Sequence, residues 1–143
     1  MKKRTFIIAV SWIAVAVCMG IIFFLSAQNG EESEGTSQWM LFLLKLPISE
    51  ETLRTAAHFL EFTGLAVLVF NALYQTCSKT MPFISFVISS AYAATDEIHQ
   101  LFVEERACSL FDWLVDSLGA ASGIAVLCLI IYIFSCLKRR RLR

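Results

Sequence analysis

The sequence has few helix-breaking residues and long stretches without charge. Among 143 residues there are 2 prolines and 6 glycines, whereas 57% of the residues are hydrophobic. Residues 6–25 and 118–137 contain no charged side chain. A helix needs about 20 residues to cross roughly 30 Å of hydrocarbon. The composition therefore excludes an ordinary soluble domain and indicates an all-α membrane protein.

We predict four transmembrane helices within a single domain of residues 1–143. The predicted spans are approximately residues 6–25, 56–75, 82–102 and 111–137. A cleavable signal peptide is the rival interpretation of the first span, because basic residues precede its apolar run. However, about 20 apolar residues exceed the usual signal-peptide core of roughly 7 to 15. We therefore interpret this segment as a span.

Basic residues are scarce in most of the loops. Nine of the 12 lysines and arginines lie before residue 5, at Lys79 or in the closing KRRRLR, residues 138–143. By the positive-inside rule, these segments and both termini face the cytoplasm, and the protein is assigned to the cytoplasmic membrane. All 12 carboxylates lie in outer loops or outer helix halves. We interpret the basic tails as contacts for membrane lipid, and not as a nucleic-acid site.

Residues 26–50 form the predicted first outer loop. Residues 26–38 are polar and contain Asn-Gly, a turn signal, so we expect a flexible segment there. The following WMLFLLKLP, residues 39–47, is apolar but too short to span a membrane. It predicts a short interfacial helix with Trp39 near the headgroups and Pro47 at its end. A re-entrant segment covering the polar residues of the spans is the alternative.

Several familiar catalytic and metal-binding patterns are missing. The sequence contains no glycine-rich phosphate loop, no nucleophile elbow and no HExxH motif. Its 5 cysteines form neither a metal-type pair nor a readable disulfide framework. Any chemistry must therefore come from polar residues within or beside the spans.

Ionisable residues occur in three of the predicted spans, at spacings that place them on shared helix faces. These sets are Arg54, His58 and Glu61; Tyr92, Asp96, Glu97, His99 and Gln100; and Asp112, Asp116, Gly119 and Gly123. With a rise of about 1.5 Å per residue, Glu61, Asp96 and Asp116 each lie roughly 6 to 9 Å below the outer surface. We therefore predict one outward-facing polar layer. The GxxxG spacing of the two glycines predicts close helix packing beside it.

The polar layer has several possible functions. Ionisable groups inside a span are costly, so they are expected to be paired or functional. An ion-paired structural network is one interpretation, but carboxylates outnumber bases, which favours a functional pocket. The HFLE and DEIH segments could bind a divalent metal or carry out acid–base chemistry. A proton or cation path is disfavoured because the cytoplasmic halves carry few polar residues. Ser26 and Gln28 are either pocket or boundary residues.

The order of these motifs resembles the VanZ-like family of small bacterial membrane proteins. The matching elements are SAQ after the first span, RxxxHFxE in the second, DEIHQxF followed by Arg106, and DxxxDxxGxxxG in the last. The resemblance covers nearly the whole chain and implies a four-helix cytoplasmic-membrane protein related to one that contributes to teicoplanin resistance. Glu104 and Glu105 replace a Pro-Gly common in the family, and Asp116 stands where Asn is common.

Our hypothesis is that the outward pocket recognises a lipid-linked or cell-wall precursor, with or without an enzymatic modification of it. Arg54 and Arg106 are expected to contact an anionic group such as phosphate. The candidate acid–base or metal-binding residues are His58, Glu61, Asp96, Glu97 and His99. The candidate substrate-binding residues are Ser26, Gln28, Arg54, Gln100, Arg106, Asp112 and Asp116. The alternative is a non-catalytic structural or binding module. The sequence favours no particular oligomeric state.

Overall fold

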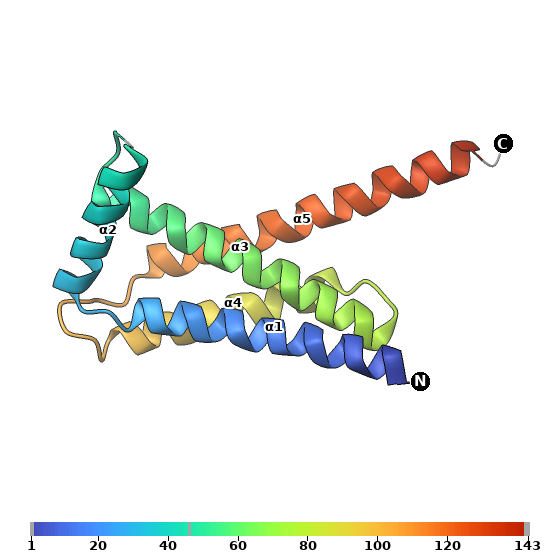
Figure 1. Cartoon of the computed structure of the whole chain (residues 1–143), viewed down its shortest axis with the longest axis horizontal. Coiled ribbons are helices and arrows are strands. Elements are labelled where there is room, and N and C mark those ends of the chain that lie inside the picture. Colours follow the sequence, from blue (N-terminus) through green and yellow to red (C-terminus); the bar gives the residue numbers. More distant parts are fainter. Residues whose placement is uncertain (1, 46, 142–143) are drawn as a thin grey trace.

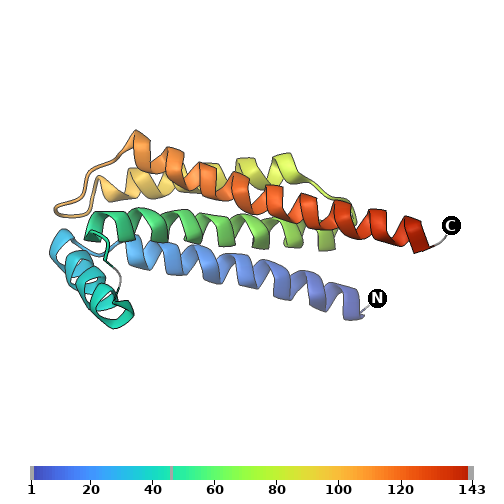
Figure 2. The same ribbon diagram turned by 90° about the horizontal axis from the view of Figure 1, so that it is seen from above.

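The fold is all-α, as predicted. The computed structural model describes residues 2–45 and 47–141, and this part of the chain contains five helices and no strand. They are α1 (Lys2–Ser26), α2 (Gly30–Leu44), α3 (Glu50–Cys77), α4 (Pro82–Gln100) and α5 (Leu110–Arg141). Helices α1, α3, α4 and α5 run up and down along the long axis, and α2 lies across one end (Figure 1, Figure 2). Residues 142–143 of the predicted basic tail lie outside the described residues.

Three of the helices, α1, α3 and α5, are long and apolar enough to cross a membrane, judged by length and composition. Helix α4 is not among them. It is 19 residues long, and Asp96, Glu97 and His99 near its end lower its mean hydropathy. The fourth predicted span therefore stays a prediction.

Helix α2 begins earlier than the sequence analysis predicted. The flexible loop expected over residues 26–38 is mostly helical, because Asn29 caps a helix that starts at Gly30. The Asn29 side chain accepts a hydrogen bond from the Glu32 amide at 2.8 Å. Glu31 in the first turn also suits the positive end of the helix dipole. At the other end, the left-handed Lys45 (φ 51°) terminates the helix before Pro47 is reached.

Helices α3 and α4 also begin at residues that favour a helix start. Ser49 caps α3, with its hydroxyl oxygen accepting a hydrogen bond from the Thr52 amide at 3.2 Å. Pro82 occupies the first turn of α4, where its missing N–H removes no helical hydrogen bond.

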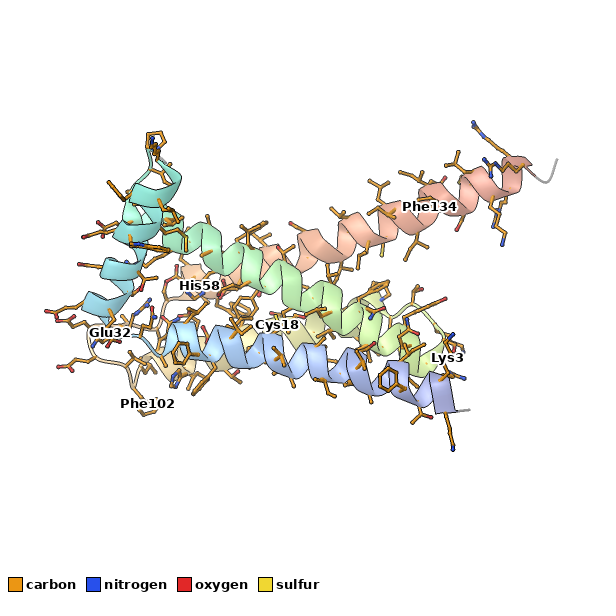
Figure 3. All side chains as sticks on the ribbon, in the orientation of Figure 1. Lys3, Cys18, Glu32, His58, Phe102 and Phe134 are labelled. Atoms are coloured by element: carbon orange, nitrogen blue, oxygen red, sulfur yellow. The ribbon has the colours of Figure 1, made fainter. Side chains whose placement is uncertain are left out.

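Helix α3 is the centre of the bundle and packs against α1, α4 and α5. The buried core residues include Ile22 of α1, Phe62 and Leu65 of α3, and Ala93 of α4. Outward-facing apolar side chains remain uncovered; Phe134, on the part of α5 that projects from the bundle, is 69% exposed (Figure 3). An apolar surface of this kind suits lipid better than water.

Helices α3 and α5 touch through their backbones. A Cβ atom on Gly119 would collide with the carbonyl oxygen of Phe59, and one on Gly123 would lie 2.8 Å from the carbonyl oxygen of Thr63. The Thr63 hydroxyl also donates a hydrogen bond to the Gly119 carbonyl oxygen at 2.9 Å. The GxxxG spacing thus provides the close helix approach that the sequence suggested. The two helices cross at this contact and diverge on either side (Figure 1).

We predict that Gly119→Ala destabilises the fold by about 2 kcal/mol or more, because the added methyl group meets backbone that cannot rotate away. Gly64→Ala is the matched control, since a Cβ at Gly64 meets nothing within 4 Å. Thermal unfolding of the purified protein measures both. An unchanged melting temperature for Gly119→Ala would contradict the close contact.

Candidate functional site

Most of the predicted site residues gather at the end of the bundle that carries α2, here termed the α2 end. They line two cavities. The acidic cavity, about 210 Å³, is lined mainly by Glu51, Arg54, His58, Glu97, Gln100, Glu105, Arg106, Asp112 and Asp116. The hydroxyl-lined cavity, about 110 Å³, is lined mainly by Gln28, Ser33, Thr36, Ser37, Arg54, His58, Glu61 and Arg106. Figure 3 shows His58 at this end, away from Lys3.

Three basic side chains separate the cavities. Arg54, His58 and Arg106 line both of them. Arg54 and His58 lie one turn apart on α3, as their spacing of four predicted. Arg106 comes from the 101–109 segment between α4 and α5. The basic wall is therefore built from elements that are distant in the sequence.

Glu97 positions the segment that carries Arg106. Its Oε2 atom accepts a hydrogen bond from the Ser109 amide at 2.7 Å, and the Ser109 hydroxyl accepts one from the Asp112 amide at 3.2 Å. Glu97 is 2% exposed, and its Oε1 atom has no hydrogen-bond partner among the described residues. The sequence analysis missed Ser109, although Ser-x-x-Asp is a helix-capping pattern.

The 101–109 segment is also joined to α2 and to Gln28, which lies between α1 and α2. The Gly30 amide donates a hydrogen bond to the Glu104 carbonyl oxygen, at 3.3 Å. Arg106 Nε donates to the Gln28 carbonyl oxygen at 3.4 Å. These bonds place the guanidinium group of Arg106 under α2.

Asp116 and His58 face each other across the α3–α5 contact. His58 Nδ1 lies 3.6 Å from Asp116 Oδ1, and the Asp116 side chain is fully buried. Neither oxygen of Asp116 has a hydrogen bond within the described part of the chain. His58 precedes Phe59, and Asp116 lies about one turn before Gly119. The close backbone contact therefore sets the position of this pair.

Asp96 belongs to a separate network that joins α1 to α4. The Ser26 hydroxyl donates a hydrogen bond to Asp96 Oδ2 at 2.9 Å. Gln100 Nε2 donates to the same Asp96 oxygen at 3.3 Å and to the Ser26 hydroxyl at 3.1 Å. Gln100 also lines the acidic cavity, whereas Ser26 and Asp96 line neither cavity. Most of this network therefore lies outside the two cavities, and only Gln100 reaches one of them.

His99 lies apart from the other candidate residues. Its ring stacks on Phe23 of α1, with 4.3 Å between the ring centroids. It lines neither cavity. Tyr92, on the same face of α4, donates a hydrogen bond to the Met19 carbonyl oxygen at 2.7 Å. The predicted Tyr92, Asp96 and His99 face is therefore the face that α4 turns toward α1.

Arg54 and Arg106 are the two arginines at the α2 end. Among the residues that the structure describes, neither Arg54 nor Arg106 forms an ion pair with a carboxylate. Burial, and then the nearby positive charge of Arg54, lower the pKa of Arg106. Two like charges beside one cavity favour binding of an anionic group between them.

The predicted divalent metal has no preassembled ligand set here. No group of three or more His, Cys, Asp or Glu side chains within the described ranges is arranged to hold a metal ion. His99, one of the two candidate imidazoles, contacts Phe23 of α1. The metal stays a prediction.

We predict that Ser26→Ala destabilises the protein by about 1 to 3 kcal/mol, because the buried Asp96 carboxylate loses a donor. The matched control is Ser135→Ala, since that exposed hydroxyl bonds to Ile131 of its own helix. Thermal unfolding compares the two variants. Equal stability of both would show that the Ser26–Asp96 bond contributes little.

Comparison with known proteins identifies a family for this chain. No curated protein and no solved structure matches the chain. The family described as VanZ/LLP1 matches residues 11–133, which include all of the predicted site residues. The match agrees with the motif order in the sequence and covers most of the 143 residues. The chain therefore belongs to the VanZ/LLP1 family.

Proposed function

We propose that the protein spans the cytoplasmic membrane four times, with both termini inside and both cavities opening outward. Helices α1, α3 and α5 have the required length and composition, and α4 runs alongside them (Figure 2). Both termini lie at the end opposite α2 (Figure 1). The basic residues of this end include Lys3, Lys79 and Arg139. Their position supports a cytoplasmic location by the positive-inside rule.

Helix α2 fits an interfacial position in this arrangement. It lies across the bundle at the proposed outer surface (Figure 1). Trp39 and Phe42 are 63% and 84% exposed, whereas Ser33 and Ser37 are buried. An amphipathic helix of this kind places its apolar residues in the headgroup region. Its hydroxyl face covers the cavity beneath.

The proposed function is recognition of a lipid-linked or cell-wall precursor through an anionic group such as phosphate. The observation that carries this proposal is that Arg54 and Arg106 line the cavities without an ion pair to any carboxylate of the described residues. Guanidinium groups bind phosphate oxygens in a bidentate geometry. An effect on teicoplanin susceptibility follows from the same proposal, because such a precursor lies on the route to the cell wall.

Acid–base chemistry on the bound precursor is an extension of this function. Glu61 lines the hydroxyl-lined cavity, whereas Glu97 and Asp116 line the acidic one. His58 lines both cavities. Carboxylates in different surroundings beside one imidazole can divide the roles of proton donor and acceptor. His99 lines neither cavity, so it would influence this chemistry only through its contact with α1.

A non-catalytic structural module is the second candidate function. It is favoured by buried hydrogen bonds that join helices without lining a cavity, such as Ser26 to Asp96 and Ser90 to Ser117. Buried polar networks of this type fix how helices pack. In this alternative, the polar layer holds the bundle together and binds no ligand.

We predict that a membrane-impermeant thiol reagent labels Cys108 on intact cells and leaves Cys77 unlabelled. Both cysteines are exposed, and they lie at opposite ends of the bundle. Permeabilised cells are the control, because both thiols should then react. Mass spectrometry of the labelled peptides gives the result. Labelling of Cys77 alone on intact cells would reverse the proposed topology.

We predict that Arg54→Gln and Arg106→Gln each weaken binding of an anionic lipid by about tenfold or more, because a charge-assisted hydrogen bond is lost. The probe is phosphatidylglycerol in phosphatidylcholine nanodiscs, with bound lipid quantified by native mass spectrometry.

Lys45→Gln is the matched control for the arginine variants. It removes a positive charge at the α2 end from a residue that lines neither cavity. Its lipid binding should equal that of the wild type. If the arginine variants instead lose thermal stability without a change in lipid binding, the structural-module alternative is supported.

A further inference from the structure

The two arginines of the acidic cavity do not pair with its carboxylates, although His58 of the same cavity lies 3.6 Å from Asp116. Arg54 and Arg106 line it together with Glu97, Asp112 and Asp116. Within the described ranges, neither arginine forms an ion pair with any of these carboxylates. The two guanidinium groups and these carboxylates thus line one cavity of about 210 Å³ without forming ion pairs.

Some carboxylate oxygens at this cavity have no hydrogen-bond donor among the described residues. Glu97 Oε2 is occupied by the Ser109 amide, and Glu97 Oε1 is buried without a described partner. Both oxygens of Asp116 are also without a hydrogen bond in the described residues. Buried acceptors that lack donors cost free energy. A ligand that supplies N–H groups at this position would recover part of that cost.

We propose that the ligand of the acidic cavity is zwitterionic and carries an ammonium group a few bonds away from its phosphate. The phosphate would contact Arg54 and Arg106, and the ammonium would donate hydrogen bonds to Glu97, Asp112 and Asp116. A primary ammonium has three N–H donors. This inference rests on the proposed anion-binding role of the two arginines and adds a second recognition element to it.

Simpler ligands fit the cavity less well. A purely anionic group would bind the arginines but would bring no positive charge or N–H donor to Glu97 and Asp112. A bare divalent cation would meet two guanidinium groups at the same cavity. A trimethylammonium headgroup carries the positive charge but has no N–H donor for Glu97 or Asp116. A phosphoethanolamine group satisfies both sides.

The test compares three soluble compounds that share a phosphate: O-phosphoethanolamine, glycerol 1-phosphate and phosphocholine. Calorimetric titration uses the full chain in phosphatidylcholine nanodiscs. We expect phosphoethanolamine to bind at least about tenfold more tightly than the other two compounds, because its ammonium group adds charge-assisted hydrogen bonds. Equal affinities, or tighter binding of glycerol 1-phosphate, would overturn the inference.

Two variants test the carboxylates directly. In Glu97→Gln and in Asp112→Asn, phosphoethanolamine and glycerol 1-phosphate should bind with about equal affinity. The glutamine retains an acceptor for the Ser109 amide, so the segment bearing Arg106 keeps its anchor. Glu104→Gln is the control, because it removes the same charge from a residue of the same segment that does not line the cavity. A preference that survives in both test variants would contradict the proposal.

A second arm identifies the source of the ligand. Native mass spectrometry of nanodiscs containing equal amounts of phosphatidylethanolamine and phosphatidylglycerol measures which lipid is retained. Retention of phosphatidylethanolamine assigns the ligand as a lipid headgroup. A preference confined to the soluble compound assigns it as a free phosphate ester with an amine, which equally supports a zwitterionic ligand.

Failure of this inference can be separated from failure of the proposed function. If all three soluble compounds bind with equal affinity and the binding depends on Arg54 and Arg106, the anion-binding function stands and the zwitterion is excluded. If none of the compounds binds to the wild type, the anion-binding function fails, and the zwitterion inference fails with it.

Discussion

The backbone contact between α3 and α5 is the constraint on which the rest of the structure depends. Gly119 and Gly123 bring α5 against the carbonyl groups of Phe59 and Thr63, at a distance that a side chain would prevent. This contact places Asp116 beside His58. Because the helices cross there, their ends diverge toward α2, and the acidic cavity lies between those ends and the 101–109 segment.

Desolvation explains why polar side chains in this bundle form two separate groups. Ser26, Asp96 and Gln100 form hydrogen bonds with one another where α1 packs on α4, although Asp96 Oδ1 has no partner among the described residues. Glu97 and Asp116 are equally buried and also have oxygens without a donor among the described residues, but they line the acidic cavity. The first group contributes to packing, whereas the second retains unused hydrogen-bonding capacity beside a cavity. Access to a cavity therefore distinguishes the candidate binding residues from the Ser26–Asp96 network.

Helix periodicity made much of this arrangement predictable, since spacings of three and four correctly grouped Arg54 with His58 and placed Gly119 at a helix contact. Two features depended on information that periodicity does not contain. The direction in which His99 points was determined by the packing of α4 on α1 through Phe23. The early start of α2 was determined by the cap that Asn29 provides, which overrode the turn signal of Asn-Gly.

The 101–109 segment connects ligand binding to the position of α2. Glu97 holds one end of this segment through Ser109, and Gly30 of α2 holds it through Glu104. Arg106 lies between these attachments. A ligand held by Arg106 would therefore bind more strongly when α2 is docked, and docking of α2 would in turn be strengthened by the ligand, as thermodynamic linkage requires. The interfacial helix and the cavity beneath it would respond together to the composition of the surrounding lipid.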